Sequence, residues 1–147
     1  MRALMISVSK TPVLIVRRSS RWKRKMVYIL LSNRSHKYRS GKRSRIIYIG
    51  TTRKGGRRPA TSAVEKASDA FNELHGVKEI EVQIASCRGR KRMETWKYLE
   101  SALLAMFREL HFELPKYNKK KGSFRDTDEI KLFRRAALKK LILEFAG

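Results

Sequence analysis

The sequence contains little cysteine and proline, and it has no long apolar run. Cys87 is the single cysteine, so no disulfide can form within the chain. The apolar run at residues 13–16 is followed at once by Arg17 and Arg18. Such a run is too short for a secretory signal, and a membrane helix needs about 20 apolar residues. We therefore expect a soluble protein of the reducing cytoplasm with no segment in a membrane.

Negative charge is missing from the first part of the chain. The 147 residues include 36 Lys+Arg and 13 Asp+Glu, which gives a net charge of +23, and the first carboxylate is Glu65. Residues 1–58 hold 18 of the basic side chains, whereas residues 59–147 have a net charge of only +5. A solvated surface normally mixes both signs, and a dense block of one sign is stabilised by a polyanion. The predicted partner is therefore nucleic acid, DNA or RNA.

The chain is short enough to form one domain, and we divide it into three parts. Residues 1–25 are predicted to be a basic extension with an extra strand, residues 26–118 the core, and residues 119–147 a basic linker and a C-terminal helix. We expect the basic side chains of the extension, the loops and the linker to contact nucleic acid. These candidates are Arg17, Arg18, Arg21, Lys23, Arg24, Lys25, Arg34, Lys37, Arg39, Lys42, Arg43, Arg53, Lys54, Arg57, Arg88, Arg90, Lys91, Arg92, Lys119, Lys120 and Lys121.

Three short runs rich in Val, Ile and Tyr in the basic half predict β-strands. They cover Pro12–Val16, Met26–Ser32 and Arg45–Thr51. The polar residues of Asn33–Ser44 predict a long basic hairpin loop between antiparallel strands. Further along, Ile80, Val82 and Ile84 alternate with polar residues and predict one more strand.

Three segments have the apolar spacing of helices. The first begins at Pro59 and ends near His75, with Ser62 and Glu65 as a capping box and an expected buried face of Ala60, Val64, Ala67, Phe71 and Leu74. The second covers residues 93–111, and the third follows a cap at residues 126–128. The fold class that these patterns predict is α+β, with a small antiparallel sheet flanked by helices.

A glutamate interrupts the apolar face of the second helix. Trp96, Leu103, Leu104, Phe107 and Leu110 form one stripe at about 100° per residue, and Glu100 projects into it. A buried carboxylate without a partner is costly, so we expect Glu100 to hold a cation, either a neighbouring Arg or Lys or a metal ion. The alternative is a carboxylate that forms an ion pair at the rim of the core.

The order of several residues resembles the signature of the GIY-YIG nuclease superfamily, which includes restriction- and homing-type domains. The resemblance covers residues 26–118. It rests on Met26-Val27-Tyr28, Tyr48-Ile49-Gly50, Arg58, Glu100 and Asn118, which occur in that order. Tyr48-Ile49-Gly50 matches to the letter, whereas the first tripeptide keeps only its tyrosine. The resemblance implies a small antiparallel sheet flanked by helices, with the active site on the sheet face.

The resemblance also implies a role for each residue. Glu100 would ligate a single divalent metal, and magnesium suits a site with one carboxylate and several waters. Arg58 would bind the scissile phosphate, Tyr28 or Tyr48 would activate or position the attacking water, and Asn118 would brace the site. Three features depart from the pattern: the interval between the two tyrosines is long, no histidine lies in the first helix, and Arg57 competes with Arg58 for the phosphate role.

Two functions remain open from the sequence. The first is a metal-dependent nuclease of GIY-YIG type that holds DNA or RNA on its basic first half. The second is a non-catalytic RNA-binding protein on the same fold, such as a ribosomal or ribosome-associated protein bound to ribosomal RNA. The tyrosines could then be ordinary strand residues and Asn118 a turn residue. The retention of Tyr28, Tyr48 and Glu100 together favours catalysis. The three histidines and Cys87 lack the spacing of ligands or nucleophiles.

Overall fold

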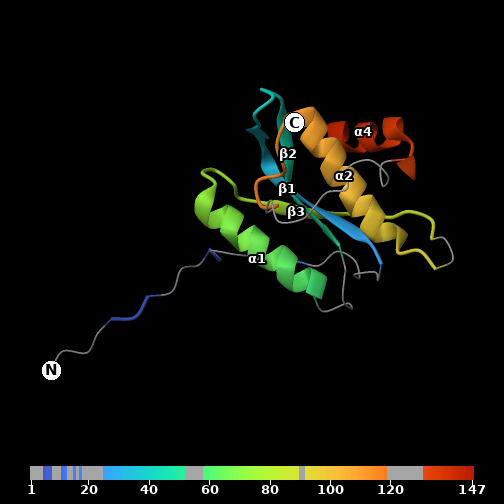
Figure 1. Cartoon of the computed structure of the whole chain (residues 1–147). Helices are drawn as coiled ribbons and strands as arrows, with labels where there is room; N and C mark the ends of the chain where they lie inside the picture. The colour runs from blue at the N-terminus through green and yellow to red at the C-terminus, as the bar shows by residue number, and fades with distance from the viewer. Residues whose placement is uncertain are drawn as a thin grey trace.

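The fold is α+β, as the sequence predicts. A computed structural model describes residues 5–7, 11–12, 15, 17, 25–51, 58–89, 92–118 and 131–147, with backbone only for residues 58–60. Within these residues, a three-stranded antiparallel sheet is flanked by three helices (Figure 1). No helix among the described residues has both the length and the apolar character needed to cross a membrane.

The sheet is built around its first strand. Strand β1 (Val27–Lys37) lies between β2 (Arg43–Thr51) and β3 (Ile80–Ala85), and both neighbours run antiparallel to it. The first six residues of β1 are all buried, because alternate side chains point to opposite faces and helices cover both faces. The two predicted strands at residues 26–32 and 45–51 and the strand at residues 80–84 are therefore confirmed.

The connection between β1 and β2 is shorter than predicted. The polar segment Asn33–Ser44 was expected to be a loop, but β1 continues to Lys37 and β2 begins at Arg43. The turn between them is tight, with Gly41 at φ +81°. The register shifts between Leu31 and His36, so extra residues bulge out of the ladder and polar side chains fit within the strand. Polar composition alone does not distinguish such a strand from a loop.

The predicted strand at Pro12–Val16 is not found at its described positions. Pro12 and Ile15 are exposed and belong to no strand, and the other three residues lie outside the described part of the chain. β-propensity indicates which residues suit a pleated surface, but a strand also needs a partner strand.

Helix α1 (Arg58–Glu73) covers one face of the sheet, and only some of the predicted side chains face it. Leu74, just past the end of the helix, packs against this core as predicted. Ala63 and Ala70 are buried against this face, whereas Val64 is 59% exposed. Small residues at this spacing let a helix approach the sheet closely. The predicted capping box is also wrong, because Ser62 is already inside the helix.

The opposite face is covered by α2 (Thr95–His111) and α4 (Arg135–Glu144), as Figure 1 shows. Helix α2 supplies the centre of this core through Leu103, Met106 and Phe107, so the predicted helix at residues 93–111 is confirmed. Among the described residues of the predicted third helix, the main helical segment begins only at Arg135. The predicted cap at residues 126–128 lies outside the described residues.

The two outer strands of the sheet differ at their free edges. Along β2, the backbone carbonyl of Phe145 accepts from Arg45 N (2.8 Å), and the backbone N–H of Tyr117 donates to the carbonyl of Ile47 (2.9 Å). Strand β3 has no further neighbour in the described sheet, and Val82 and Ile84 are 37% and 41% exposed. The chain itself thus occupies the edge of β2, and no described segment pairs with the edge of β3.

Candidate functional site

Two tyrosines and a glycine form the centre of the candidate site. Tyr28 on β1 pairs with Gly50 on β2, and the Tyr28 and Tyr48 rings lie 5.8 Å apart between centroids. A Cβ on Gly50 would be 2.7 Å from the ring of Tyr48 and 2.8 Å from the hydroxyl oxygen of Tyr28. A side chain at position 50 would therefore displace both rings. The glycine lets two aromatic rings meet over one point of the backbone.

The Tyr28 hydroxyl is held in its protonated form. Burial is the main cause that raises its pKa above the ordinary value, and the neighbouring Tyr48 raises it further. The hydroxyl forms hydrogen bonds with the Tyr48 and Ser62 side chains, and the Glu100 carboxylate is close enough to add to the shift. At neutral pH, Tyr28 is thus a hydrogen-bonding group and not a phenolate base. We call Tyr28, Tyr48, Ser62 and Glu100 the tyrosine–glutamate cluster.

Glu100 reaches this cluster from the first half of α2. It is half-buried, so the prediction that it interrupts a fully buried stripe is only partly met. Trp96 lies one helical turn earlier on the same side of α2, and the Lys25 ammonium lies 5.3 Å from the centre of its ring. A lysine therefore stands just ahead of β1, over the turn of α2 that precedes the carboxylate.

Three buried side-chain polar atoms have no hydrogen-bond partner within the described part of the chain, and two of them belong to neighbours of the candidate residues; the third is Nδ1 of His111. The first two are the hydroxyl of Thr51, which directly follows Gly50, and the indole nitrogen of Trp96. Buried polar groups normally have partners, so such atoms often mark the place of a ligand or a water. Sequence reasoning did not select Thr51, Trp96 or Ser62. The position of Thr51 beside the Tyr-Ile-Gly triplet was the one available signal.

Asn118 joins the segment after α2 to the strand that carries Tyr48 and Gly50. Its side-chain oxygen accepts from the backbone N–H of Ile49 at 2.9 Å, and its side-chain nitrogen donates to the carbonyl of Ile49 at 2.7 Å. This pair of bonds fixes the backbone between the two site residues of β2. Asn118 thus braces the strand that carries Tyr48 and Gly50.

The predicted phosphate-binding arginine lies at the start of α1. The backbone of Arg58 is the first residue of that helix. The side chains of Arg57 and Arg58 are both outside the described residues, so the two remain equal candidates. The start of α1 follows the end of β2, which carries Gly50 and Thr51.

The residues present fit one type of metal site better than others. No group of three or more His, Cys, Asp or Glu side chains that could hold a metal occurs among the described residues. A fully protein-bound zinc or calcium site is therefore not formed by them. A single carboxylate beside hydroxyl groups suits a magnesium ion that keeps several waters, and Glu100 would be its protein ligand.

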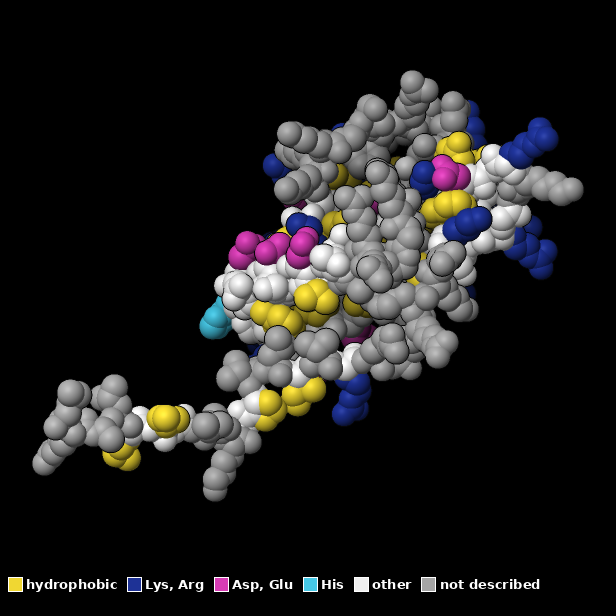
Figure 2. Space-filling model, turned by 90° about the horizontal axis from the view of Figure 1, so that it is seen from below, with side chains coloured by type: hydrophobic (Ala, Val, Ile, Leu, Met, Phe, Trp, Pro, Cys, Tyr) yellow, Lys and Arg dark blue, Asp and Glu magenta, His cyan; other side chains and the backbone are white. Residues whose placement is uncertain are grey.

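The described basic candidates all have exposed side chains. They are Arg17, Lys25, Arg34, Lys37, Arg39, Lys42, Arg43, Arg88 and Arg92. In Figure 2, Lys and Arg side chains gather at one end of the face in view, and a row of acidic side chains lies toward the other. The remaining candidates lie outside the described residues: Arg18, Arg21, Lys23, Arg24, Arg53, Lys54, Arg57, Arg90, Lys91, Lys119, Lys120 and Lys121.

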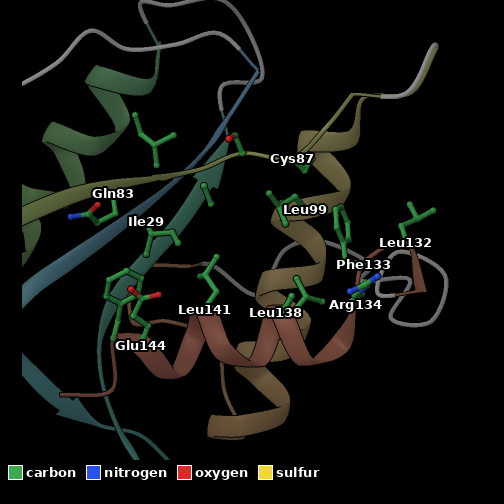
Figure 3. Close-up of a pocket in the computed structure, with 15 residues that line it drawn as sticks. Ile29, Gln83, Cys87, Leu99, Leu132, Phe133, Arg134, Leu138, Leu141 and Glu144 are labelled. Carbon is green, nitrogen blue, oxygen red and sulfur yellow. The ribbon is translucent and has the colours of Figure 1, made fainter.

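A hollow on the other face of the sheet takes no part in this site. It has a volume of about 570 Å³ and lies between β3, α2 and α4, where Ile29, Leu99, Leu138 and Leu141 line it (Figure 3). Ile29 and Tyr28 are successive residues of β1 and point to opposite faces. The hollow is therefore separated from the tyrosine rings by the sheet.

Comparison with known proteins gave no relative. No family model matches the sequence, and searches of curated proteins and of solved structures found no similar protein. The function must therefore be argued from the geometry of the site and from the charge of the chain.

Proposed function

We propose that this protein is a metal-dependent nuclease of the GIY-YIG type, which hydrolyses phosphodiester bonds of nucleic acid. The observation that carries the proposal is the convergence of Tyr28, Tyr48 and Glu100, which are distant in the sequence and come from two strands and a helix. A scaffold for RNA does not need a carboxylate that acts electrostatically on the buried Tyr28 hydroxyl. Hydrolysis needs hydrogen-bonding groups for water and an anionic ligand for a cation in one place.

Each group has a chemical task in this proposal. The Tyr28 and Tyr48 hydroxyls hold the attacking water, with Tyr28 protonated and therefore able to donate a hydrogen bond. Arg58, or Arg57, binds the scissile phosphate, because a guanidinium matches two phosphate oxygens. Glu100 holds the divalent ion, which when bound supplies stabilisation of the charge that develops on the phosphoryl and leaving oxygens. Asn118 keeps the backbone of β2 in place beneath these groups.

A second function is favoured by the charge distribution. The first 58 residues contain no carboxylate, and every described basic candidate is exposed. A non-catalytic RNA-binding protein, such as a ribosomal or ribosome-associated protein, would use these cations to contact phosphates. The choice between the two functions depends on whether Glu100 takes part in chemistry.

The first test is cleavage by purified protein with magnesium, on mixed DNA and RNA substrates, for the wild type and for Glu100→Gln. Under the nuclease proposal, Glu100→Gln reduces cleavage at least about 100-fold, because the anionic ligand of the cation is lost. Binding of the same substrates changes little. Glu65→Gln is the matched control, since Glu65 is exposed on α1 and its loss is expected to leave cleavage unchanged.

The outcomes separate the two functions. Cleavage that is lost both with EDTA and in Glu100→Gln supports the nuclease. Equal cleavage by wild type and Glu100→Gln removes Glu100 from the mechanism. No cleavage of any substrate, with tight and salt-dependent binding of structured RNA, supports the non-catalytic function instead.

A further inference from the structure

The far end of the β1–β2 hairpin carries a group of cations that the proposed chemistry does not use. Lys37 is paired with Arg43 across the two strands, and Lys42 lies in the turn between them. We call these three residues, together with Lys116, the hairpin-end cations. All four side chains are exposed. The Arg43 guanidinium donates to the side-chain oxygen of Ser35 at 3.0 Å and to its backbone carbonyl at 2.6 Å, which holds this cation at the hairpin end. Lys37 lies directly opposite Arg43, and like charges in opposed positions destabilise a hairpin.

The hairpin end is fixed to the body of the protein. The Tyr38 side chain is buried beside the turn, where its hydroxyl donates to the carbonyl of Ile46 at 2.6 Å and its ring packs edge-on against Phe107 of α2. The backbone N–H of Ser40 donates to the carbonyl of His111 at 3.1 Å. The turn thus rests on the C-terminal end of α2, and its cations have a set position relative to the sheet.

The positive charge at this end is only partly compensated. The Nε of Arg39 lies 3.9 Å from the carboxylate Oε2 of Glu113. Among the described residues, no carboxylate forms an ion pair with a hairpin-end cation. The cations also act on nearby histidines. After burial, the charges of Lys116 and Arg43 lower the pKa of His36, and that of Lys42 lowers the pKa of His111. Burial and these cations together oppose protonation of the two histidines, while the charge of Glu113 acts the other way on His111.

The occupied edge of β2 connects this end to the tyrosine–glutamate cluster. Lys116, Tyr117 and Asn118 follow one another along the edge: Lys116 lies 5.7 Å from the centre of the Tyr38 ring, and Asn118 holds Ile49 beside Gly50. Figure 1 shows the β1–β2 turn at one end of the sheet, opposite the end where β1 starts and β2 finishes. From Gly50 to Arg43 is seven residues of β2, which at about 3.3 Å each is about 23 Å.

We propose that the hairpin-end cations are a second phosphate-binding patch, which holds a double-stranded arm of the nucleic acid about 23 Å from the phosphate at the tyrosine–glutamate cluster. At 3.4 Å per base pair, this separation corresponds to about seven base pairs. The inference rests on the proposed function only in taking the cluster as the place where one phosphate is bound. A duplex is the chosen ligand because two rigid patches at a fixed separation match a stiff rod, whose persistence length is about 150 base pairs.

The test is a binding series that needs no cleavage. Glu100→Gln protein is titrated with blunt mixed-sequence duplexes of 5 to 16 base pairs, as DNA and as RNA, each closed at one end by the same non-nucleotide linker. Affinity is expected to rise in a step between about 6 and 10 base pairs, where a duplex first reaches both patches. Adding Lys37→Gln and Lys42→Gln should remove the step and lower the salt slope on 12-base-pair duplexes by about two, without change on 5-base-pair duplexes.

The control replaces two lysines elsewhere with the same loss of charge. Lys139→Gln with Lys140→Gln removes exposed cations from α4 and should leave the step in place. A smooth rise of affinity with length overturns the inference, and so does an equal loss of affinity for 5- and 12-base-pair duplexes in the hairpin variant. A step that is seen with a wild type that does not cleave keeps the inference and rejects the nuclease. Cleavage by the wild type without a step in affinity supports the nuclease and rejects the inference about the hairpin-end cations.

Discussion

At the scale of single residues, Asn118 carries a structural role that can be separated from chemistry. Its amide makes two hydrogen bonds to the backbone of Ile49, and both are partly buried. Asn118→Ala leaves the Ile49 N–H and carbonyl without these partners, so we expect a loss of about 2 kcal/mol in the free energy of unfolding.

Urea unfolding followed by tryptophan fluorescence measures this loss. Asn72→Ala is the control, because Asn72 is exposed on α1 and its replacement is expected to change stability by less than about 0.5 kcal/mol. If Asn118→Ala proves as stable as this control, the two bonds do not hold the strand and the proposed brace is wrong.

The sequence indicated site residues best where a backbone position has room for only one residue type. Tyr48-Ile49-Gly50 indicated a site, and the structure shows that Gly50 is the residue that lets both tyrosine rings meet. Thr51 and Trp96 were missed because nothing in their local sequence shows that the Thr51 hydroxyl and the Trp96 indole nitrogen are buried. Such burial depends on the packing of α2 against the end of the sheet, which no local pattern records.

At the scale of elements, the presence of the sheet strands and of α1 and α2 was easier to predict than the ends of the elements or the faces they bury. The extent of α1 was close to the prediction, yet its contact with the sheet uses Ala63 and Ala70 in place of Val64. A hydrophobic pattern favours the largest apolar side chains, whereas the sheet selects for close approach at its tyrosine-bearing face. Similarly, the polar residues after Leu31 concealed a bulged strand, because a bulge relaxes the strict alternation of side chains.

The contact between α2 and the β1–β2 turn makes stability depend on pH. His36 and His111 have pKa values lowered in the folded state, first by burial and then by neighbouring cations. In the unfolded chain, these two histidines take up protons near pH 6.5, whereas in the folded protein they do so only at lower pH. The stability is therefore complete above about pH 6.5 and falls as the pH drops toward the folded-state pKa values.

We expect the urea midpoint to decline between about pH 7.5 and pH 5. His111→Gln should make this decline shallower, since one of the two lowered pKa values is then absent. His75→Gln serves as the control, because His75 is exposed at the end of α1 and should leave the slope unchanged. An identical slope in wild type and His111→Gln would show that His111 does not couple pH to folding.

At the scale of the whole molecule, the net charge of +23 sets the strength of nucleic-acid binding. Each phosphate that the protein neutralises contributes about 0.9 to the slope of log affinity against log salt. With exposed cations near the site and at the hairpin end, we expect a slope steeper than about −4 on duplexes of 16 base pairs. Fluorescence anisotropy between about 50 and 300 mM KCl measures it, and a slope shallower than about −1 contradicts a phosphate-binding surface.

The fold class was predictable because the strand runs and the helix spacing indicated the same small α+β domain. The way in which distant segments join the edge of the sheet could not be predicted. The peptide groups of Phe145 and Tyr117 complete the edge of β2, and both come from segments far from β2 in the sequence. Backbone hydrogen bonds of this kind carry no side-chain signature, so the occupied edge and the path along it to the hairpin end were visible only in the structure.

The edge of β3, which has no partner strand among the described residues, affects how copies of the protein behave toward one another. An exposed strand with Val82 and Ile84 can pair with the same strand of another molecule and start aggregation. Repulsion between highly charged copies opposes this contact. At 0.1 M salt, charges that are more than about 10 Å apart are largely screened, so the repulsion weakens. High salt releases bound nucleic acid during purification, but it also weakens the charge repulsion that keeps copies apart. Removal of nucleic acid therefore requires high salt, whereas prevention of self-association requires low salt.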